Sequence, residues 1–225
     1  MSFMHNFKLV NCDTDSIMIC KTDFAPFLIN ERQDLLKEIN SIFPTNIKWE
    51  DDGYYFNVIC LASKNYVLKS EDGKIKYKGS ALKSSKTEPA LREFLYAIIQ
   101  TILDEKYDYK QIYQTYIDEI LAVKDIKRWA SKKTLSQTTY QSDRANETKI
   151  INAIKGTEYK EGDRIFCYFA IDGNLKLVEN YNNDHDIPRL LKKLFTTAKI
   201  FDSIIEKDTF INFGLVKNLK LLGLK

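Results

Sequence analysis

The chain has few of the residues that build zinc sites and nucleophilic catalytic pairs. Its 225 residues include only two histidines and four cysteines, and neither type forms a closely spaced pair. A zinc site or a Ser-His or Cys-His pair needs these side chains to converge, so neither is predicted. We expect free, buried thiols and a loop position for His185. The cysteines are Cys12, Cys20, Cys60 and Cys167.

Long hydrophobic runs are also missing. No window approaches the roughly 20 apolar residues of a membrane-spanning helix, and the N-terminus has no signal pattern. We therefore expect a soluble, intracellular protein, in the host cytoplasm or at a replication site if the source is a virus or phage. The composition, 44% hydrophobic and 29% charged, is that of a globular protein. The length suffices for one large or two small domains.

Charge is distributed unevenly along the chain, although the net charge is only +3. Residues 1–57 carry nine acidic and five basic side chains, whereas residues 64–86 carry seven lysines and two acidic residues. Residues 124–133 form a second basic cluster. Lysine runs usually lie on solvated faces. Two basic clusters after an acidic segment also suit a polyanion held beside a metal ion.

Two aspartates one residue apart lie between short apolar, β-favouring segments near the N-terminus. This pattern predicts a hairpin whose turn is Asp13-Thr14-Asp15-Ser16. Carboxylate oxygens are the ligands that Mg²⁺ prefers, and two of them on one turn can begin a site that substrate phosphates complete.

Two other interpretations of this turn remain open. Asp, Thr and Ser are ordinary turn residues, so the segment can be a plain hairpin turn. An Asp-x-Asp motif also occurs in metal-dependent glycosyltransferases, which hold a divalent ion against a sugar-nucleotide diphosphate. That fold normally has a nucleotide-binding α/β unit before the motif, and only a dozen residues precede Asp13.

The segment after the hairpin predicts a small α+β unit. Apolar spacing indicates a helix over 31–43, capped by Asn30 and ended by Pro44. Strands and turns then indicate an antiparallel meander that joins the hairpin in one sheet, with the helix on one face. The expected strands are 47–50, 54–61, 66–69 and 74–78.

From Thr87 onward the pattern becomes mainly helical, which places a domain boundary between Lys78 and Thr87. We expect domains at 1–82 and 83–225: a small antiparallel sheet with a helix, followed by a mainly helical domain, an α+β protein overall. The expected elements of the second domain are helices over about 87–102, 109–123, 149–155 and 188–205 and a strand over 165–171.

A second motif gives the aspartates their context. Lys64-Asn65-Tyr66 follows them by about fifty residues and leads to Tyr77-Lys78-Gly79. This order of turn, helix, hairpin and Lys-x-Tyr resembles the C-terminal palm and thumb of family B DNA polymerases. Looser matches continue the resemblance over essentially the whole chain. They are Thr87-Glu88-Pro89, Arg128-Trp129-Ala130, Lys132-Lys133-Thr134-Leu135 and 160–165.

The resemblance implies template-directed DNA synthesis by a nucleotidyltransferase of DNA replication. Primer-template DNA and a deoxynucleoside triphosphate would be its substrates, and two Mg²⁺ ions its cofactors. Asp13 and Asp15 would be the motif C catalytic carboxylates, with Asp15 the principal metal ligand and Asp13 more water-mediated. Nucleotide and primer would meet Thr14, Ser16, Lys64 and Tyr66. DNA would meet Lys78, Gly79, Lys83, Lys86, Arg128, Lys132 and Lys133.

Each of these roles has a plainer alternative. Tyr66 on an alternating strand can be a half-buried aromatic residue, and the thumb lysines can lie on solvated faces. Trp129 is expected in the core rather than as a platform for base stacking.

Parts of the family pattern are missing. Asn11 stands where an aromatic residue is usual, and no segment matches motif A, motif B or a proofreading exonuclease. Because two carboxylates rarely hold catalytic Mg²⁺ without another one, we expect the chain alone to be inactive. An N-terminal fragment or subunit with motifs A and B would complete it, whether the chain is a split-gene subunit, a truncated gene or an excised piece.

A palm sheet that lacks the rest of the polymerase would expose an apolar face. The alternative function is that of a non-catalytic DNA-binding or interaction protein that retains the thumb without the chemistry.

Overall fold

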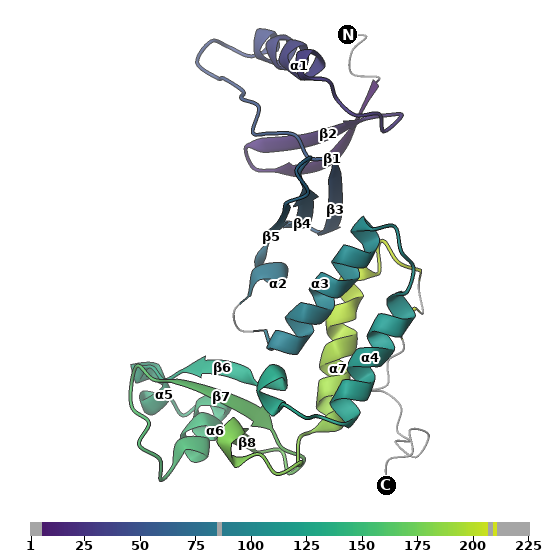
Figure 1. Cartoon of the computed structure of the whole chain (residues 1–225). Helices are drawn as coiled ribbons and strands as arrows, with labels where there is room; N and C mark the ends of the chain where they lie inside the picture. Colours follow the sequence, from purple (N-terminus) through teal and green to yellow (C-terminus); the bar gives the residue numbers. More distant parts are fainter. Residues whose placement is uncertain (1–5, 85–86, 207–208, 211–225) are drawn as a thin grey trace. The chain divides into compact units, whose positions relative to one another are not determined.

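The computed structural model describes residues 6–84, 87–206 and 209–210. The chain divides into two compact units, residues 1–81 (unit 1) and 82–225 (unit 2), whose elements are labelled in Figure 1. The division lies one residue from the boundary expected at 82/83. Mixed helices and small antiparallel sheets confirm the α+β class.

Unit 1 opens with a hairpin of β1 (Phe7–Asp13) and β2 (Ser16–Lys21). The two strands pair antiparallel, and Asp13 lies opposite Ser16, so Thr14 and Asp15 form a two-residue turn. Thr14 has φ +52°, in the left-handed region that turns use and most residues avoid. The expected hairpin and its turn are therefore present.

Helix α1 (Ile29–Ile42) follows, close to the predicted 31–43. The predicted cap at Asn30 is wrong, because the N-cap residue is Leu28. Glu31 accepts the Leu28 N–H at 2.7 Å, and Lys21 Nζ lies 2.7 Å from the same carboxylate. A side chain in the first turn thus satisfies the free N–H at the helix start, and the helix begins earlier.

The rest of unit 1 is an antiparallel meander in the order β3 (Asn57–Ala62), β4 (Asn65–Lys69) and β5 (Ile75–Lys78). The prediction of one sheet is wrong, since the hairpin and the meander are separate sheets. The predicted strand at 47–50 does not form either. Asn40 of α1 instead exchanges two hydrogen bonds with the Trp49 backbone, at 2.7 and 3.0 Å, which ties this segment to the helix.

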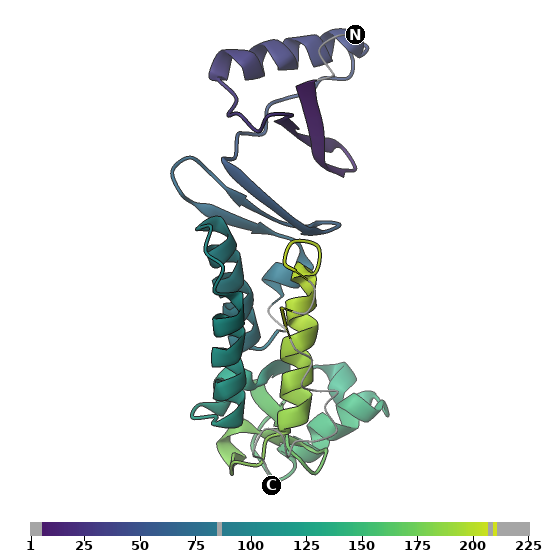
Figure 2. The same cartoon turned by 90° about the vertical axis from the view of Figure 1, so that its right-hand side faces the viewer.

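Helices dominate the first part of unit 2. The short α2 (Ser80–Lys83) spans the division, and α3 (Pro89–Leu103), α4 (Tyr109–Leu121) and α7 (Ile187–Ala198) pack against one another (Figures 1 and 2). Their shared core includes the fully buried Phe94, Ile98, Ile117 and Leu194. None of the helices in the described part of the chain is long and apolar enough to cross a membrane.

A second layer of unit 2 is the antiparallel sheet β6 (Ser131–Thr134), β7 (Arg164–Phe169) and β8 (Leu175–Leu177). Helices α5 (Gln137–Gln141) and α6 (Ala145–Ile154) lie with it, and Leu135, Ile150, Ile165 and Leu177 share its core. Short 3-10 turns complete the unit at Ile126–Trp129 (η2), Val178–Asn180 (η3) and Lys199–Phe201 (η4).

Burial is very uneven between the units. Among the described residues from 6 to 58 none is buried, and α1 has no buried residue. Large apolar side chains stay exposed there, including Phe24 (72%), Ile29 (68%) and Ile42 (72%). These side chains lie in the loop after β2 and on α1, so they do not test the apolar sheet face that was expected.

Several single-residue expectations can be compared with the structure. All four cysteines are free, but only Cys167 is buried, so the prediction of buried thiols fails for the other three. Their strands belong to small sheets that have little core to cover them. Trp129 is in the core, 1% exposed. His185 is buried outside the named strands and bonds Tyr181 Oη and the Ile120 carbonyl oxygen.

Candidate active site

The two aspartates of the hairpin turn have different surroundings. Asp13 is half-buried, and its carboxylate accepts the Thr14 hydroxyl at 3.2 Å and faces Lys64 Nζ at 3.3 Å. The Ser16 hydroxyl donates to the Asp13 carbonyl oxygen at 3.1 Å. Thr14 and Ser16 thus brace the turn around Asp13.

Asp15 is exposed, and its carboxylate has no hydrogen bond or ion pair with any residue that the structure describes. The described residues contain no group of three or more His, Cys, Asp or Glu side chains placed to hold a metal ion. Two hard carboxylates on one turn fit one side of a Mg²⁺ coordination sphere, which needs further oxygen ligands to close. Asp15 has the freer ligand atoms of the pair.

Lys64 reaches Asp13 from a different sheet. It lies in the β3–β4 turn with φ +60°, a left-handed conformation in a residue with a side chain. The fold thereby joins the two motifs that the sequence places about fifty residues apart. A second link between the two sheets is the Cys60 thiol, 3.8 Å from the Val10 carbonyl oxygen.

Tyr66, Lys78 and Gly79 cluster around the same turn. Tyr66 on β4 is half-buried and pairs directly with the exposed Lys78 on β5, so their side chains lie on one face. Gly79 follows Lys78 with φ +100° and packs against the backbone of Lys64 and Asn65. Five predicted site residues, Asp13, Lys64, Tyr66, Lys78 and Gly79, therefore belong to unit 1 and to neighbouring turns and strands.

The predicted basic residues of unit 2 divide by environment. Lys83 is exposed at the end of α2, and Lys86 lies outside the described residues. Arg128 forms ion pairs with Glu119 and, at 2.5 Å, with Glu93. Trp129 Nε1 donates to Glu119 at 3.0 Å in the same network. The charge of Arg128 is thus balanced within the unit.

Lys132 and Lys133 lie on opposite faces of β6. Lys133 is half-buried and pairs with the core residue Ile165, whereas Lys132 is exposed and pairs with Phe166. Lys127 Nζ lies 4.8 Å from the centre of the Phe166 ring, and the exposed Arg164 follows on the same face of β7. We name this group, Lys127, Lys132, Arg164 and Phe166, the Lys132 face.

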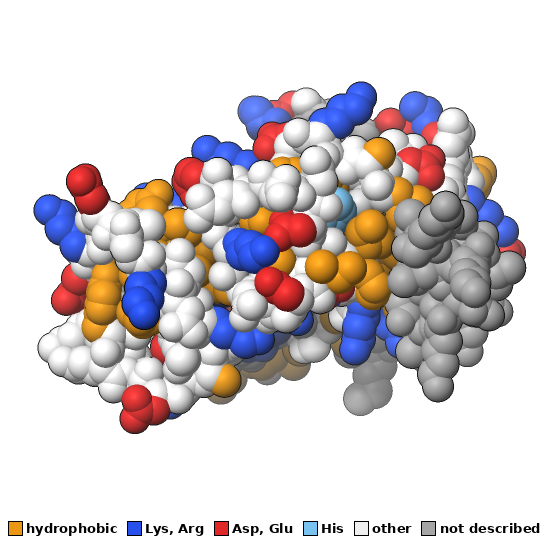
Figure 3. Space-filling view, turned by 90° about the horizontal axis from the view of Figure 1, so that it is seen from below, with side chains coloured by type: hydrophobic (Ala, Val, Ile, Leu, Met, Phe, Trp, Pro, Cys, Tyr) orange, Lys and Arg blue, Asp and Glu red, His pale blue; other side chains and the backbone are white. Residues whose placement is uncertain are grey.

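Phe166 and Arg164 are candidate binding residues that sequence reasoning missed. The alternation of Ile165 and Cys167 with Arg164 and Phe166 was the available signal, because it marks a strand with one apolar and one basic-aromatic face. Figure 3 shows basic and acidic side chains interspersed on the face seen from below.

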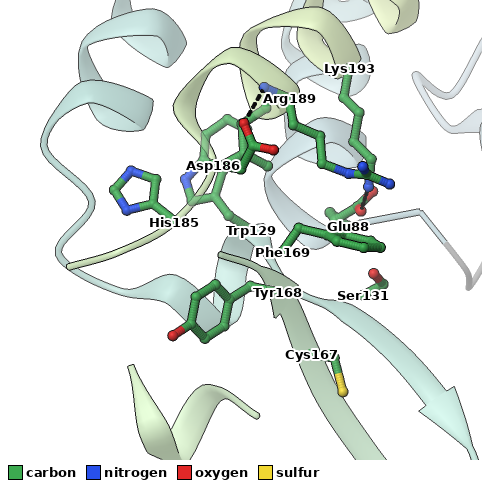
Figure 4. Close-up of a pocket in the computed structure, with 11 residues that line it drawn as sticks. Glu88, Trp129, Ser131, Cys167, Tyr168, Phe169, His185, Asp186, Arg189 and Lys193 are labelled. Carbon is green, nitrogen blue, oxygen red and sulfur yellow. Dashed lines mark hydrogen bonds and ion pairs between the residues drawn. The ribbon is translucent and has the colours of Figure 1, made fainter. Parts of the chain in front are cut away.

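A small hollow in unit 2 is structural in character. Its volume of about 10 Å³ is barely room for one water molecule. Figure 4 shows Lys193 extending towards Glu88, with which it forms an ion pair, and Arg189 over Phe169, 3.5 Å from the ring centre. These contacts fasten α7 to the start of α3 and to β7, and leave no space for an organic ligand.

Comparisons with known proteins give a family and a similar fold. The model of DNA polymerase family B matches residues 2–203. The structure is similar to that of the family B DNA polymerase from the hyperthermophilic archaeon Pyrobaculum calidifontis, with a TM-score of 0.63 and 16% identity over 88% of this chain. The chain spans 27% of the length of that polymerase. No curated protein sequence matches. The chain belongs to DNA polymerase family B.

Proposed function

We propose that the chain is the C-terminal palm and thumb portion of a family B DNA polymerase and contributes motif C and duplex binding to template-directed DNA synthesis. The observation that carries this proposal is the juxtaposition in unit 1 of the exposed Asp15, the Asp13 carboxylate and Lys64 Nζ, 3.3 Å from Asp13. Two separate motifs of the family pattern thus meet at one turn.

In this proposal the two aspartates have unequal roles. Asp15 is the principal Mg²⁺ ligand, because its carboxylate is exposed and has no partner among the described residues. Asp13 Oδ1 already accepts the Thr14 hydroxyl and faces Lys64 Nζ, so Asp13 contributes more weakly. Bound Mg²⁺ would make the primer 3′-hydroxyl easier to deprotonate and would stabilise charge on the leaving pyrophosphate.

The remaining residues around the turn orient the substrates. Lys64 carries a point charge that suits a primer or nucleotide phosphate, and Tyr66 and Lys78 share one face beside it. Thr14 and Ser16 act through their hydrogen bonds to Asp13, which hold the turn in place. Gly79 allows the Lys64 turn to approach β5 closely.

Duplex binding is assigned to exposed basic residues that form no ion pair with the described residues. Lys78, Lys83 and Lys132 have no ion pair with any residue in the described ranges, and Arg164 and Lys127 extend the set on the Lys132 face. Contacts of this kind meet phosphates without reading sequence, and they weaken as salt rises. Arg128 and Lys133 are less suited, because one is ion-paired and the other faces the core.

We further propose that a polymerase segment with motifs A and B covers unit 1 and completes the site. Exposed Phe24, Ile29 and Ile42 support this, because unit 1 leaves these large apolar side chains uncovered. The absence of three convergent metal ligands among the described residues also leaves room for a carboxylate from another segment.

The test is primer extension by the purified chain, alone and mixed with the polypeptide encoded directly upstream. The proposal predicts no extension by the chain alone and Mg²⁺-dependent extension by the mixture. Extension by the chain alone would contradict the incomplete site. Salt-dependent duplex binding with no extension in any mixture would instead favour the alternative, a non-catalytic DNA-binding protein, which the lack of three convergent ligands also fits.

A further inference from the structure

Gly79 lies closer to its neighbours than any residue with a side chain could. Its φ of +100° is in the region that side chains rarely adopt. A Cβ at this position would overlap the Lys64 carbonyl oxygen and Asn65 Oδ1, and would lie 2.8 Å from Asn65 Cα. Two of these three atoms belong to the backbone of the Lys64–Asn65 turn, which cannot move aside without changing the turn.

Asn65 fixes the same turn from the other side. Its Oδ1 accepts the Ala81 N–H at 3.0 Å, and its Nδ2 donates to the Ser63 carbonyl oxygen at 2.9 Å. One side chain therefore joins the β3–β4 turn to the residues that follow β5. The Gly79 backbone packs directly against Lys64 and Asn65.

The conformation that these contacts hold is unfavourable by itself. Lys64 has φ +60°, which side chains with a Cβ avoid, so the surrounding structure must impose it. This conformation places Lys64 Nζ 3.3 Å from Asp13 Oδ1. The ion pair is partly exposed, with side-chain exposures of 69% and 30%, so its own attraction is weak.

We propose that Gly79 and Asn65 are positioning residues, which fold the Lys64 turn so that its ammonium group meets Asp13 and leaves Asp15 as the open ligand. The meaning of this arrangement for catalysis rests on the proposed function. The arrangement itself involves no DNA, metal ion or nucleotide, and it can be tested in the chain as it is.

A zero-length carbodiimide cross-link between Lys64 and Asp13 reports the arrangement directly, because this reagent joins an amine to a carboxylate only when they touch. The Lys21–Glu31 pair, at 2.7 Å in the same unit, gives an internal reference product. The test variant is Gly79→Ala. Gly73→Ala is its matched control, since Gly73 also has positive φ (+78°) but has nothing within 4 Å of an added Cβ.

Peptide mapping by mass spectrometry should show the Lys64–Asp13 product falling about tenfold relative to the reference in Gly79→Ala. The added Cβ would both overlap the Lys64–Asn65 turn and strain the positive φ of residue 79. Gly73→Ala should keep the product near its wild-type level. Equal yields in the two glycine variants, with the reference product retained, would overturn the proposal.

A second pair of variants decides the matter if Gly79→Ala loses both products through unfolding of the unit. Asn65→Ala removes the acceptor for the Ala81 N–H and the donor to Ser63, and should lower the Lys64–Asp13 product, whereas Asn65→Asp keeps the acceptor oxygen and should recover part of it. Wild-type yield in Asn65→Ala would refute the positioning role. Failure of primer extension with an intact cross-link would count against the proposed function only.

Discussion

Replacement of Arg128 by alanine should destabilise unit 2 but should leave the salt dependence of DNA binding nearly unchanged. Its guanidinium bridges Glu119 of α4 and Glu93 of α3, and Trp129 Nε1 donates to Glu119 in the same network. Hydrogen bonds between charged groups contribute about 1.5–3 kcal/mol each when buried. Arg128 and Glu93 are 37% and 50% exposed, so solvent screening reduces this.

Two such bonds, reduced by screening, give an expected loss of about 2 kcal/mol in the free energy of unfolding for Arg128→Ala. For a unit of this size that loss lowers Tm by roughly 4–8 °C. Urea and thermal unfolding followed by helical circular dichroism would measure both quantities. Fluorescence anisotropy with a labelled primer-template duplex, over a series of salt concentrations, would measure binding in the same preparation.

The matched variant is Lys132→Ala, in which an exposed lysine without a described partner is removed. It should leave Tm almost unchanged and reduce the slope of log K against log salt by about 0.9, the value for one phosphate contact. The reasoning is refuted if Arg128→Ala lowers the salt slope by that amount with no loss of stability, or if Lys132→Ala destabilises the unit.

Two further predictions concern thiols and pH. Burial raises the pKa of the Cys167 thiol to about 11. Iodoacetamide should therefore label the exposed Cys12 much faster than Cys167 in the native protein at pH 8. Equal labelling rates would contradict the structure. The hydrogen bond from Lys21 lowers the pKa of the Glu31 carboxyl, and the bond from the Leu28 N–H adds to this effect. The ionised Glu31 therefore stabilises the fold fully above its unfolded pKa near 4.5. This stabilisation is lost as pH falls through the lower pKa of the folded state. The difference in Tm between pH 7 and pH 3 should therefore be smaller for Glu31→Gln than for the wild type. An unchanged difference would show that the contacts of Glu31 do not contribute to stability.

Local patterns in the sequence predicted most of the individual elements. The hairpin turn at Asp13–Ser16, the meander and the helices at 89–103 and 109–121 follow from apolar spacing and turn residues, which act over a few positions. β6 was missed because Ser131–Thr134 contains no apolar residue, and its place in the sheet depends on backbone pairing with β7.

Contacts between distant segments explain the errors. The strand expected at 47–50 is replaced by a loop because Asn40, on the preceding helix, satisfies the Trp49 backbone. Sequence spacing likewise cannot reveal that Arg128 is enclosed by Glu93 and Glu119, since both partners come from other helices.

The candidate site was predicted as two motifs but not as one arrangement. The order of Asp13, Asp15, Lys64 and Tyr66 pointed to the family. The 3.3 Å contact of Lys64 with Asp13 depends on the left-handed turn and on Gly79, and no local pattern encodes that packing.

Mg²⁺-dependent primer extension by the Asp15→Ala variant, mixed with the polypeptide encoded directly upstream, tests the central claim most directly. The matched control is Asp52→Ala, which removes an exposed carboxylate of unit 1 that has no partner among the described residues. The account predicts that Asp15→Ala abolishes extension, with duplex binding retained, and that Asp52→Ala extends primers like the wild type. Wild-type extension by Asp15→Ala would contradict the assignment of Asp15 as the principal metal ligand.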